Sequence, residues 1–304
     1  MPGFNKKYFP LTTVLTVILT NPLFSQLPDF AKISNLHQGD SLNISYLIAH
    51  GVKTASGKTI CWFPVDSLPE KRMNEIADMI NTGIKAAEKF IHAPLPWQAH
   101  STTEPYTFYF RLDSFVSHAS GSGFVSIPFW RIKNDKAPWL HEAIHEMLNT
   151  KTLGWFNPAI KEEEWSKNMP LWLFEGLPDY ISQKVSQLEN LPRFDVFSKS
   201  NSFNVDSLFT SDIKSEKGVY ILSFIGTKGV MPELSSKDRS LYAPAFYHGS
   251  CSFVQYIATH YDFKIFLDAI SSFGEEHAII EKRTGKPLAI LKKEWLSKLK
   301  PGTD

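Results

Sequence analysis

Cysteine is scarce in this chain, which carries only Cys61 and Cys251 among its 304 residues. A fold stapled by several disulfides is therefore excluded. The two thiols can pair with each other if the protein is exported, or they can lie in the core as small apolar side chains. Both alternatives stay open, because the sequence does not give the distance between the two side chains.

An excess of charge of either sign is also missing. The 32 Lys and Arg residues nearly balance the 31 Asp and Glu residues, and no long basic or acidic run occurs. Because nucleic-acid binding depends on a concentrated basic surface, we expect no nucleic-acid partner. Internal repeats and low-complexity tracts are absent, whereas 43% of the residues are hydrophobic. This composition indicates a packed globular chain that forms one large domain or two lobes.

Apolar runs that are long enough to cross a bilayer are lacking as well. Residues 11–20 form a mainly apolar run, but a transmembrane helix needs about 20 such residues. Lys6 and Lys7 precede this run, and a helix-breaking Asn-Pro pair follows it at residues 21–22. This order is typical of a signal peptide over residues 1–26, with a buried N-terminal helix as the alternative. We therefore expect an exported protein, periplasmic or extracellular, whose mature chain has no stable membrane span.

The first half of the chain has the pattern of strands around one long helix. Strands are predicted where apolar and β-branched residues alternate or cluster, at residues 41–48, 58–65, 106–112 and 124–132. A helix is predicted from Ser67, because Ser67 and Glu70 form a capping box and a stripe of apolar residues follows at helical spacing. The stripe consists of Met73, Ile76, Ala77, Ile80, Ile84, Ala87 and Ile91. Pro94 and Pro96 are expected to end this helix.

From about residue 138 onward the pattern is mostly helical. The first of these helices has start signals at Asp135 and Pro138 and a stop signal at Gly154. Further helices are predicted at residues 168–183, 243–261, 263–273 and 287–299, with a loop-rich stretch between the first two of them. We expect an α+β fold with a small mixed-sheet lobe, about residues 27–155, and a mostly helical lobe, about residues 156–304.

The helix after Pro138 contains the sequence His-Glu-Ala-Ile-His at residues 141–145. Positions i and i+4 of a helix lie on the same face, so His141 and His145 can bind one metal ion. Glu142 can reach a water molecule on that metal. A catalytic zinc ion takes three protein ligands, and Glu175 is the best candidate for the third. It lies in an apolar run where an unpaired carboxylate is costly to bury; a surface Glu near a helix start is the alternative.

The strand predicted just before this helix opens with Gly121, Ser122 and Gly123. A strand of this kind next to the helix suits a sheet edge that pairs with an extended peptide. Gly123, Phe124 and Val125 would then form a substrate-binding edge. An ordinary hairpin strand is the alternative.

Two segments together resemble the gluzincin branch of the zinc metallopeptidases, which includes thermolysin and aminopeptidase N. They are His-Glu-x-x-His at residues 141–145 and Trp-Leu-Phe-Glu-Gly-Leu-Pro-Asp-Tyr at residues 172–180. The second is similar to the family pattern Trp-Leu-x-Glu-Gly-x-Ala-x-Tyr. The similarity covers about residues 120–185 and extends more weakly to residues 247–256 and 284–295. It implies a zincin-like fold, one zinc ion, and hydrolysis of a peptide or protein substrate.

The resemblance also implies a role for single residues. The zinc ligands would be His141, His145 and Glu175, and Glu142 would be the general base. An enzyme that has lost turnover and only binds is the alternative function.

Further roles implied by the resemblance lie outside the two motifs. Asp179 matches the acidic position that orients a ligand histidine, although Pro178 stands where relatives have Ala and can kink the helix. A donor to the oxyanion is expected from Tyr247 or His248, with Tyr242 in reserve.

Overall fold

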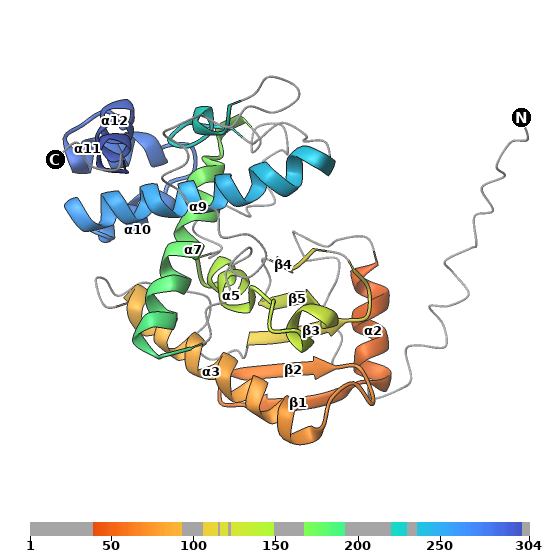
Figure 1. Ribbon diagram of the computed structural model, residues 1–304. Coiled ribbons are helices and arrows are strands. Elements are labelled where there is room, and N and C mark those ends of the chain that lie inside the picture. Colours follow the sequence, from red (N-terminus) through yellow and green to blue (C-terminus); the bar gives the residue numbers. More distant parts are fainter. Residues whose placement is uncertain are drawn as a thin grey trace, which may run out of the picture.

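The computed structural model describes residues 39–92, 106–114, 116–120, 123–148, 167–191, 220–229 and 236–299. Within these ranges the chain has the expected α+β fold, with a mixed sheet in its first half and helices in its second (Figure 1). The expected signal peptide, Pro94, Pro96 and Gly154 lie outside the described residues. None of the helices in the described ranges combines the length and apolar character that a membrane crossing needs.

The sheet of the described chain has five strands in the order β1-β2-β3-β5-β4. Their bounds are Val52–Ser56 for β1, Thr59–Phe63 for β2, Tyr106–Arg111 for β3, His118–Ala119 for β4 and Phe124–Pro128 for β5. The three central strands β2, β3 and β5 are parallel, and the two outer strands are antiparallel to their neighbours.

Helices cover both faces of this sheet, as the strand sequences require. Alternate residues of a strand point to opposite faces. One face packs into the main core with helices α3 (Glu70–His92) and α5 (Trp139–Leu148), through Cys61, Phe63, Phe108, Phe110, Val125 and Ile127. The other face packs against α2 (Asp40–His50) through the intervening residues Trp62, Tyr109 and Phe124.

The prediction of a strand over residues 41–48 is wrong, because this segment belongs to α2. Leu42 and Tyr46, which completed the strand-like alternation, are 77% and 45% exposed. The buried apolar residues are Ile44, Leu47 and Ile48, which have the i, i+3, i+4 spacing of one helix face. Packing of these residues against the sheet therefore favours the helical period over the strand period.

Helix α3 confirms the apolar stripe, since every residue of the stripe is buried. The prediction of a capping box formed by Ser67 and Glu70 is wrong. The backbone N–H groups of Arg72 and Met73 bond to the carbonyl of Pro69, so the helix begins after Pro69. The hydroxyl of Ser67 is buried and has no hydrogen-bond partner in the described chain.

The strand predicted over residues 124–132 is confirmed only in its first half. Strand β5 ends at Pro128, and residues Phe129–Lys133 form the short helix α4. Proline has no backbone N–H to donate, which makes it a natural end for strand pairing. Helix α5 then begins after Pro138, whose carbonyl accepts the N–H of Glu142.

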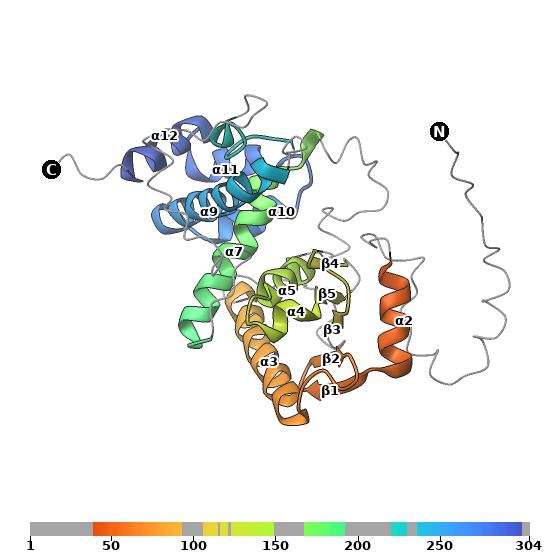
Figure 2. The same ribbon diagram turned by 45° about the vertical axis from the view of Figure 1, so that its right-hand side comes forward.

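The helices after α5 lie together on one side of the sheet region (Figure 2). They are α7 (Leu171–Leu188), the short η3 (Ile221–Ser223), α9 (Ser236–His260), α10 (Lys264–Ile270), α11 (Glu276–Thr284) and α12 (Leu288–Leu299). Four of them confirm predicted helices with shifted ends. Helix α11 was not predicted, because its buried residues Glu276 and Ile280 do not form an apolar stripe.

The core is continuous from the sheet to these helices. The rings of Trp172 and Trp295 each lie 5.1 Å from the ring of Phe253, which links α7, α9 and α12. Cys61 and Cys251 are buried and form no disulfide, so they behave as small core side chains.

A buried polar cluster attaches α2 to the sheet. The carboxylate of Asp40 is fully buried and accepts hydrogen bonds from Arg111 at 3.1 Å and from Ser126 at 3.3 Å. The Nε2 atom of His118 lies 2.7 Å from the same carboxylate. The cluster therefore joins α2 to β3, β4 and β5 through one acidic side chain.

We expect Asp40→Ala to lower the free energy of unfolding by about 3–5 kcal/mol, because it removes the fully buried carboxylate next to the Arg111 guanidinium and leaves the more exposed Asp113, at 3.4 Å, as a weaker partner. Urea unfolding monitored by fluorescence measures this loss. The matched control is Glu75→Ala, which removes an exposed partner of Arg72 and should cost less than about 1 kcal/mol. Equal effects of the two substitutions would contradict the assigned role of Asp40.

Candidate metal centre

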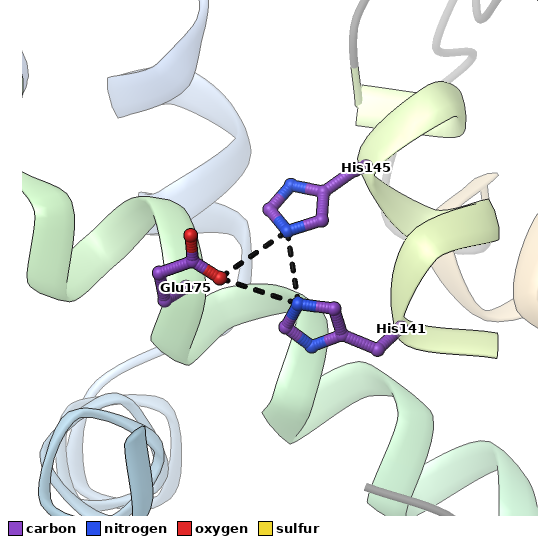
Figure 3. Close-up of side chains that lie close together, drawn as sticks. All are labelled: His141, His145 and Glu175. Carbon is purple, nitrogen blue, oxygen red and sulfur yellow. Dashed lines mark hydrogen bonds and ion pairs between the residues drawn. The ribbon is translucent and has the colours of Figure 1, made fainter. Parts of the chain in front are cut away.

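Three side chains from two helices meet at one point between α5 and α7 (Figure 3). The Nε2 atoms of His141 and His145 lie 3.0 Å apart. The Oε2 atom of Glu175 lies 3.2 Å from the first nitrogen and 3.4 Å from the second. The described chain therefore contains a group of one carboxylate and two imidazoles that can hold a metal ion.

The spacing of these three atoms fits a small tetrahedral cation. Zinc binds nitrogen and oxygen ligands at about 2.0–2.2 Å, which separates the ligand atoms of a tetrahedron by roughly 3.3–3.6 Å. The observed separations of 3.0, 3.2 and 3.4 Å are close to this range. The chemistry also fits, because two histidines and one glutamate form a common ligand set of catalytic zinc sites.

Glu175 is held inside the protein rather than on its surface. Its side chain is 13% exposed, whereas its neighbours Trp172, Leu173 and Leu177 are fully buried. Pro170 precedes the first turn of α7, and its carbonyl accepts the N–H groups of Leu173 and Phe174. The alternative of a surface glutamate at a helix start is therefore wrong.

The charges at the centre compensate one another. Burial raises the pKa of Glu175, but hydrogen bonds from His141 and His145 outweigh it and hold that pKa at about 2. Burial lowers the pKa of His141, and the nearby carboxylates of Asp179, Glu175 and Glu142 outweigh it and raise that pKa well above its ordinary value. The ionised carboxylate of Glu175 thus favours a positive charge at this point.

Asp179 orients one of the two imidazoles. Its Oδ1 atom lies 2.7 Å from Nδ1 of His141, on the side of the ring opposite the Nε2 atom that faces Glu175. Pro178 does not divert it, because α7 continues through Pro178 to Leu188. A carboxylate in this position fixes the tautomer of the ring and raises its basicity as a ligand.

Glu142 is buried beside the centre and is not engaged elsewhere. The residue is 7% exposed, and its carboxylate forms no hydrogen bond within the described part of the chain. Its charge acts on both His141 and Tyr247. The carboxylate is therefore available to exchange a proton with a group at the centre.

Tyr247 reaches the centre from α9. Its ring centroid lies 6.1 Å from that of His141, and its hydroxyl donates a hydrogen bond to the Glu175 carboxylate. Burial and the charges of Glu175, Glu142 and Asp179 raise its pKa well above 10, so the hydroxyl keeps its proton. His248 follows about 100° further around the helix, and its side chain makes no hydrogen bond, ion pair or ring contact within the described ranges. Of the two candidate donors, Tyr247 is therefore the one that contacts the centre in the described chain.

A close approach of two helices places Tyr247. A Cβ atom on Gly176 would lie 2.7 Å from the carbonyl carbon of Ser250, which is closer than real Cβ atoms come. Glycine at this position lets α9 pack directly against α7, next to Glu175. The Glu-Gly pair in the sequence thus combines a ligand with the residue that admits the neighbouring helix.

The predicted substrate-binding edge at Gly123, Phe124 and Val125 is wrong as an edge, because β5 lies between β3 and β4. Val125 pairs with Ala119 of β4, and the carbonyl of Phe124 accepts the N–H of Ser120. Strand β4 contains only two residues, too few to form a recognisable pattern in the sequence.

Two polar residues near the centre were not predicted from the sequence. Glu146 is fully buried on α5 and accepts hydrogen bonds from the Ser120 hydroxyl and the Gly123 N–H. Arg131 lies on α4, within electrostatic reach of Glu142 and Tyr247. Pro128 was the one sequence signal that the predicted strand ends before Arg131. Nothing in the sequence distinguished Glu146 from a surface acid.

We expect Asp179→Asn to weaken zinc binding about 10–100-fold, because His141 loses the carboxylate that orients it and raises its basicity. A competition titration with a zinc-chelating dye measures the change. Glu189→Gln removes an exposed carboxylate at the end of the same helix and should leave the affinity within about threefold of the original. Unaltered binding by the Asp179 variant would contradict the orienting role.

A scan against models of known protein families and a search of curated proteins find no match to this chain. The description of the centre therefore rests on its residues and their geometry.

Proposed function

We propose that the protein is an exported zinc-dependent peptidase of the gluzincin type, with a zincin-like fold. The observation that carries the proposal is the convergence of His141, His145 and Glu175 with a buried, unengaged Glu142 beside them. The sheet followed by helices, with the ligands on α5 and α7, is consistent with that family. The pattern of residues 1–26 supports export to the periplasm or the cell exterior.

Zinc is the proposed metal because of its ligands. Two imidazole nitrogens and one carboxylate oxygen suit zinc better than magnesium or calcium, which prefer oxygen ligands. A site with three protein ligands keeps a fourth position open for water or substrate. When bound, the ion lowers the pKa of water to about 7 and polarises the carbonyl of the substrate.

The protein's own residues supply the proton transfers and the stabilisation of charge. Glu142 accepts a proton from the attacking water molecule and delivers it to the amine that leaves when the peptide bond breaks. The Tyr247 hydroxyl, which keeps its proton, donates a hydrogen bond to the oxyanion that forms on the attacked carbonyl. Asp179 holds His141 in place throughout, so this imidazole does not have to reorient, whereas the Tyr247 hydroxyl turns from the Glu175 carboxylate to the oxyanion.

We expect Glu142→Gln to lower kcat for peptide hydrolysis by at least about 100-fold, because the amide cannot accept the proton. Zinc content, measured by mass spectrometry, should stay near one ion per chain, because the three ligands are intact. Cleavage of a mixed peptide library by the wild-type protein, its loss with a chelator and its return with zinc provide the control. A folded wild-type protein that binds zinc and cleaves no peptide would instead support the alternative of a binding protein.

A second comparison separates the two candidates for the oxyanion donor. Tyr247→Phe removes only the hydroxyl and should lower kcat by about 100-fold, with a smaller change in KM. His248→Gln should change kcat by less than about threefold, because this side chain makes no contact with the centre in the described chain. Steady-state kinetics on one peptide measures both. A larger loss for the His248 variant would reverse the assignment.

A further inference from the structure

The two ligand histidines of the centre are held in different ways. The Nδ1 atom of His141 lies 2.7 Å from Asp179, so a hydrogen bond fixes that ring from the side away from the metal position. The Nδ1 atom of His145 is buried and has no hydrogen-bond partner within the described ranges. Its ring packs on that of Phe174, with the ring centroids 4.5 Å apart. On the side away from the metal position, packing alone therefore holds the His145 ring.

The position of His145 then depends on the backbone of α5. Metal-ligating histidines are usually oriented by a partner of their second ring nitrogen, and His145 lacks one in the described chain. The residue also belongs to the last turn of α5, which ends at Leu148. Carbonyl groups in the last turn of a helix have no partners within the helix. A link between this turn and the sheet would therefore decide where the second imidazole lies.

Glu146 forms such a link, one residue after His145. The residue is fully buried. Its Oε1 atom accepts a hydrogen bond from the Ser120 hydroxyl at 3.1 Å, and its Oε2 atom accepts one from the Gly123 N–H at 2.9 Å. One carboxylate thus binds the residue that follows β4 and the residue that precedes β5.

The segment that Glu146 binds is itself well defined. The hydroxyl of Ser120 accepts the N–H of Phe124 at 3.2 Å, and the N–H of Ser120 donates to the carbonyl of Phe124 at 3.0 Å. Gly123 has a φ of 94°, in the left-handed region that favours glycine. A Cβ atom on Gly123 would meet no atom within 4 Å, so the backbone conformation and not the space requires glycine. The link therefore joins the ligand helix to a fixed point of the sheet.

We propose that Glu146 is a positioning residue of the metal centre. By attaching the last turn of α5 to the ends of β4 and β5, it places His145, just as Asp179 places His141. The inference rests on the zinc site of the proposed peptidase, but it does not require that the protein cleaves a peptide.

Two substitutions of Glu146 test the link. Glu146→Ala removes both hydrogen bonds and should weaken zinc binding about 10–100-fold, as the loss of an outer partner of a metal ligand does. Glu146→Gln keeps an acceptor for the Gly123 N–H and offers an N–H to the Ser120 hydroxyl, so its affinity should stay within about threefold of the wild type. A competition titration with a zinc-chelating dye measures both changes.

A matched control accounts for any loss of stability. Leu291→Ala removes a fully buried side chain of α12, so it should lower the urea midpoint of unfolding but leave the zinc affinity within about threefold of the wild type. Wild-type affinity in Glu146→Ala, or an equal loss of affinity in the Ala and Gln variants of Glu146, would overturn the proposal. An equal loss in Leu291→Ala would also overturn it, because the effect would then follow stability alone.

Proton NMR of the cobalt-substituted protein shows which imidazole moves. A histidine that binds the ion through Nε2 carries an exchangeable proton on Nδ1, and the paramagnetic ion shifts the signal of that proton away from the rest of the spectrum. Asp179→Asn should shift the signal of His141, which assigns it. Glu146→Ala should shift the other signal and leave that of His141 in place. A shift of the His141 signal alone, or of neither signal, would contradict the action of Glu146 through His145.

The outcomes for metal binding and for hydrolysis are distinguishable. A wild-type protein that binds zinc and cleaves no peptide, together with weakened binding in Glu146→Ala, supports the positioning role and overturns the proposed hydrolysis. Peptide cleavage by the wild type with unchanged zinc affinity in Glu146→Ala supports the hydrolysis and overturns the positioning role. A folded wild-type protein that binds no zinc would overturn both.

Discussion

The burial of several ionisable side chains between α5 and α7 is the constraint on which the centre depends. Carboxylates are costly to bury unless opposite charge lies next to them. Glu175 stays ionised because both imidazoles bond to it, and His141 favours its charged form because Asp179 and Glu175 flank it. A metal cation supplies the same positive charge that a proton would supply. Two electrostatic requirements, those of the fold and of a metal site, are therefore met by the same residues.

Close packing turns this electrostatic arrangement into a defined geometry. A Cβ atom on Gly83 would lie 2.5 Å from the ring of Trp139, so glycine lets α3 hold the first turn of α5. Gly176 has the same role between α7 and α9, beside Glu175. Glu146 attaches the opposite side of α5 to the start of β5 through the N–H of Gly123. The ligand helices are thus fixed by neighbours on each side, and the side chains need little reorganisation.

Much of this arrangement was predictable, because a long segment with a regular apolar period indicates its own secondary structure. The stripe of α3, the spacing of His141 and His145, and the apolar surroundings of Glu175 all follow from local pattern. Helix α2 was not predicted, because its exposed Leu42 completes an alternation of apolar residues that is typical of a strand. The direction of Asp179 depends on the path of α7 beyond Pro178, which local sequence does not determine.

The central claim is that His141, His145 and Glu175 hold a single zinc ion. Anomalous diffraction at the zinc absorption edge, from crystals grown with zinc, tests it most directly. The account predicts one strong peak within about 2.0–2.2 Å of the two Nε2 atoms and a carboxylate oxygen of Glu175. A folded protein with no peak at this position, or with zinc bound only by other side chains, would contradict it.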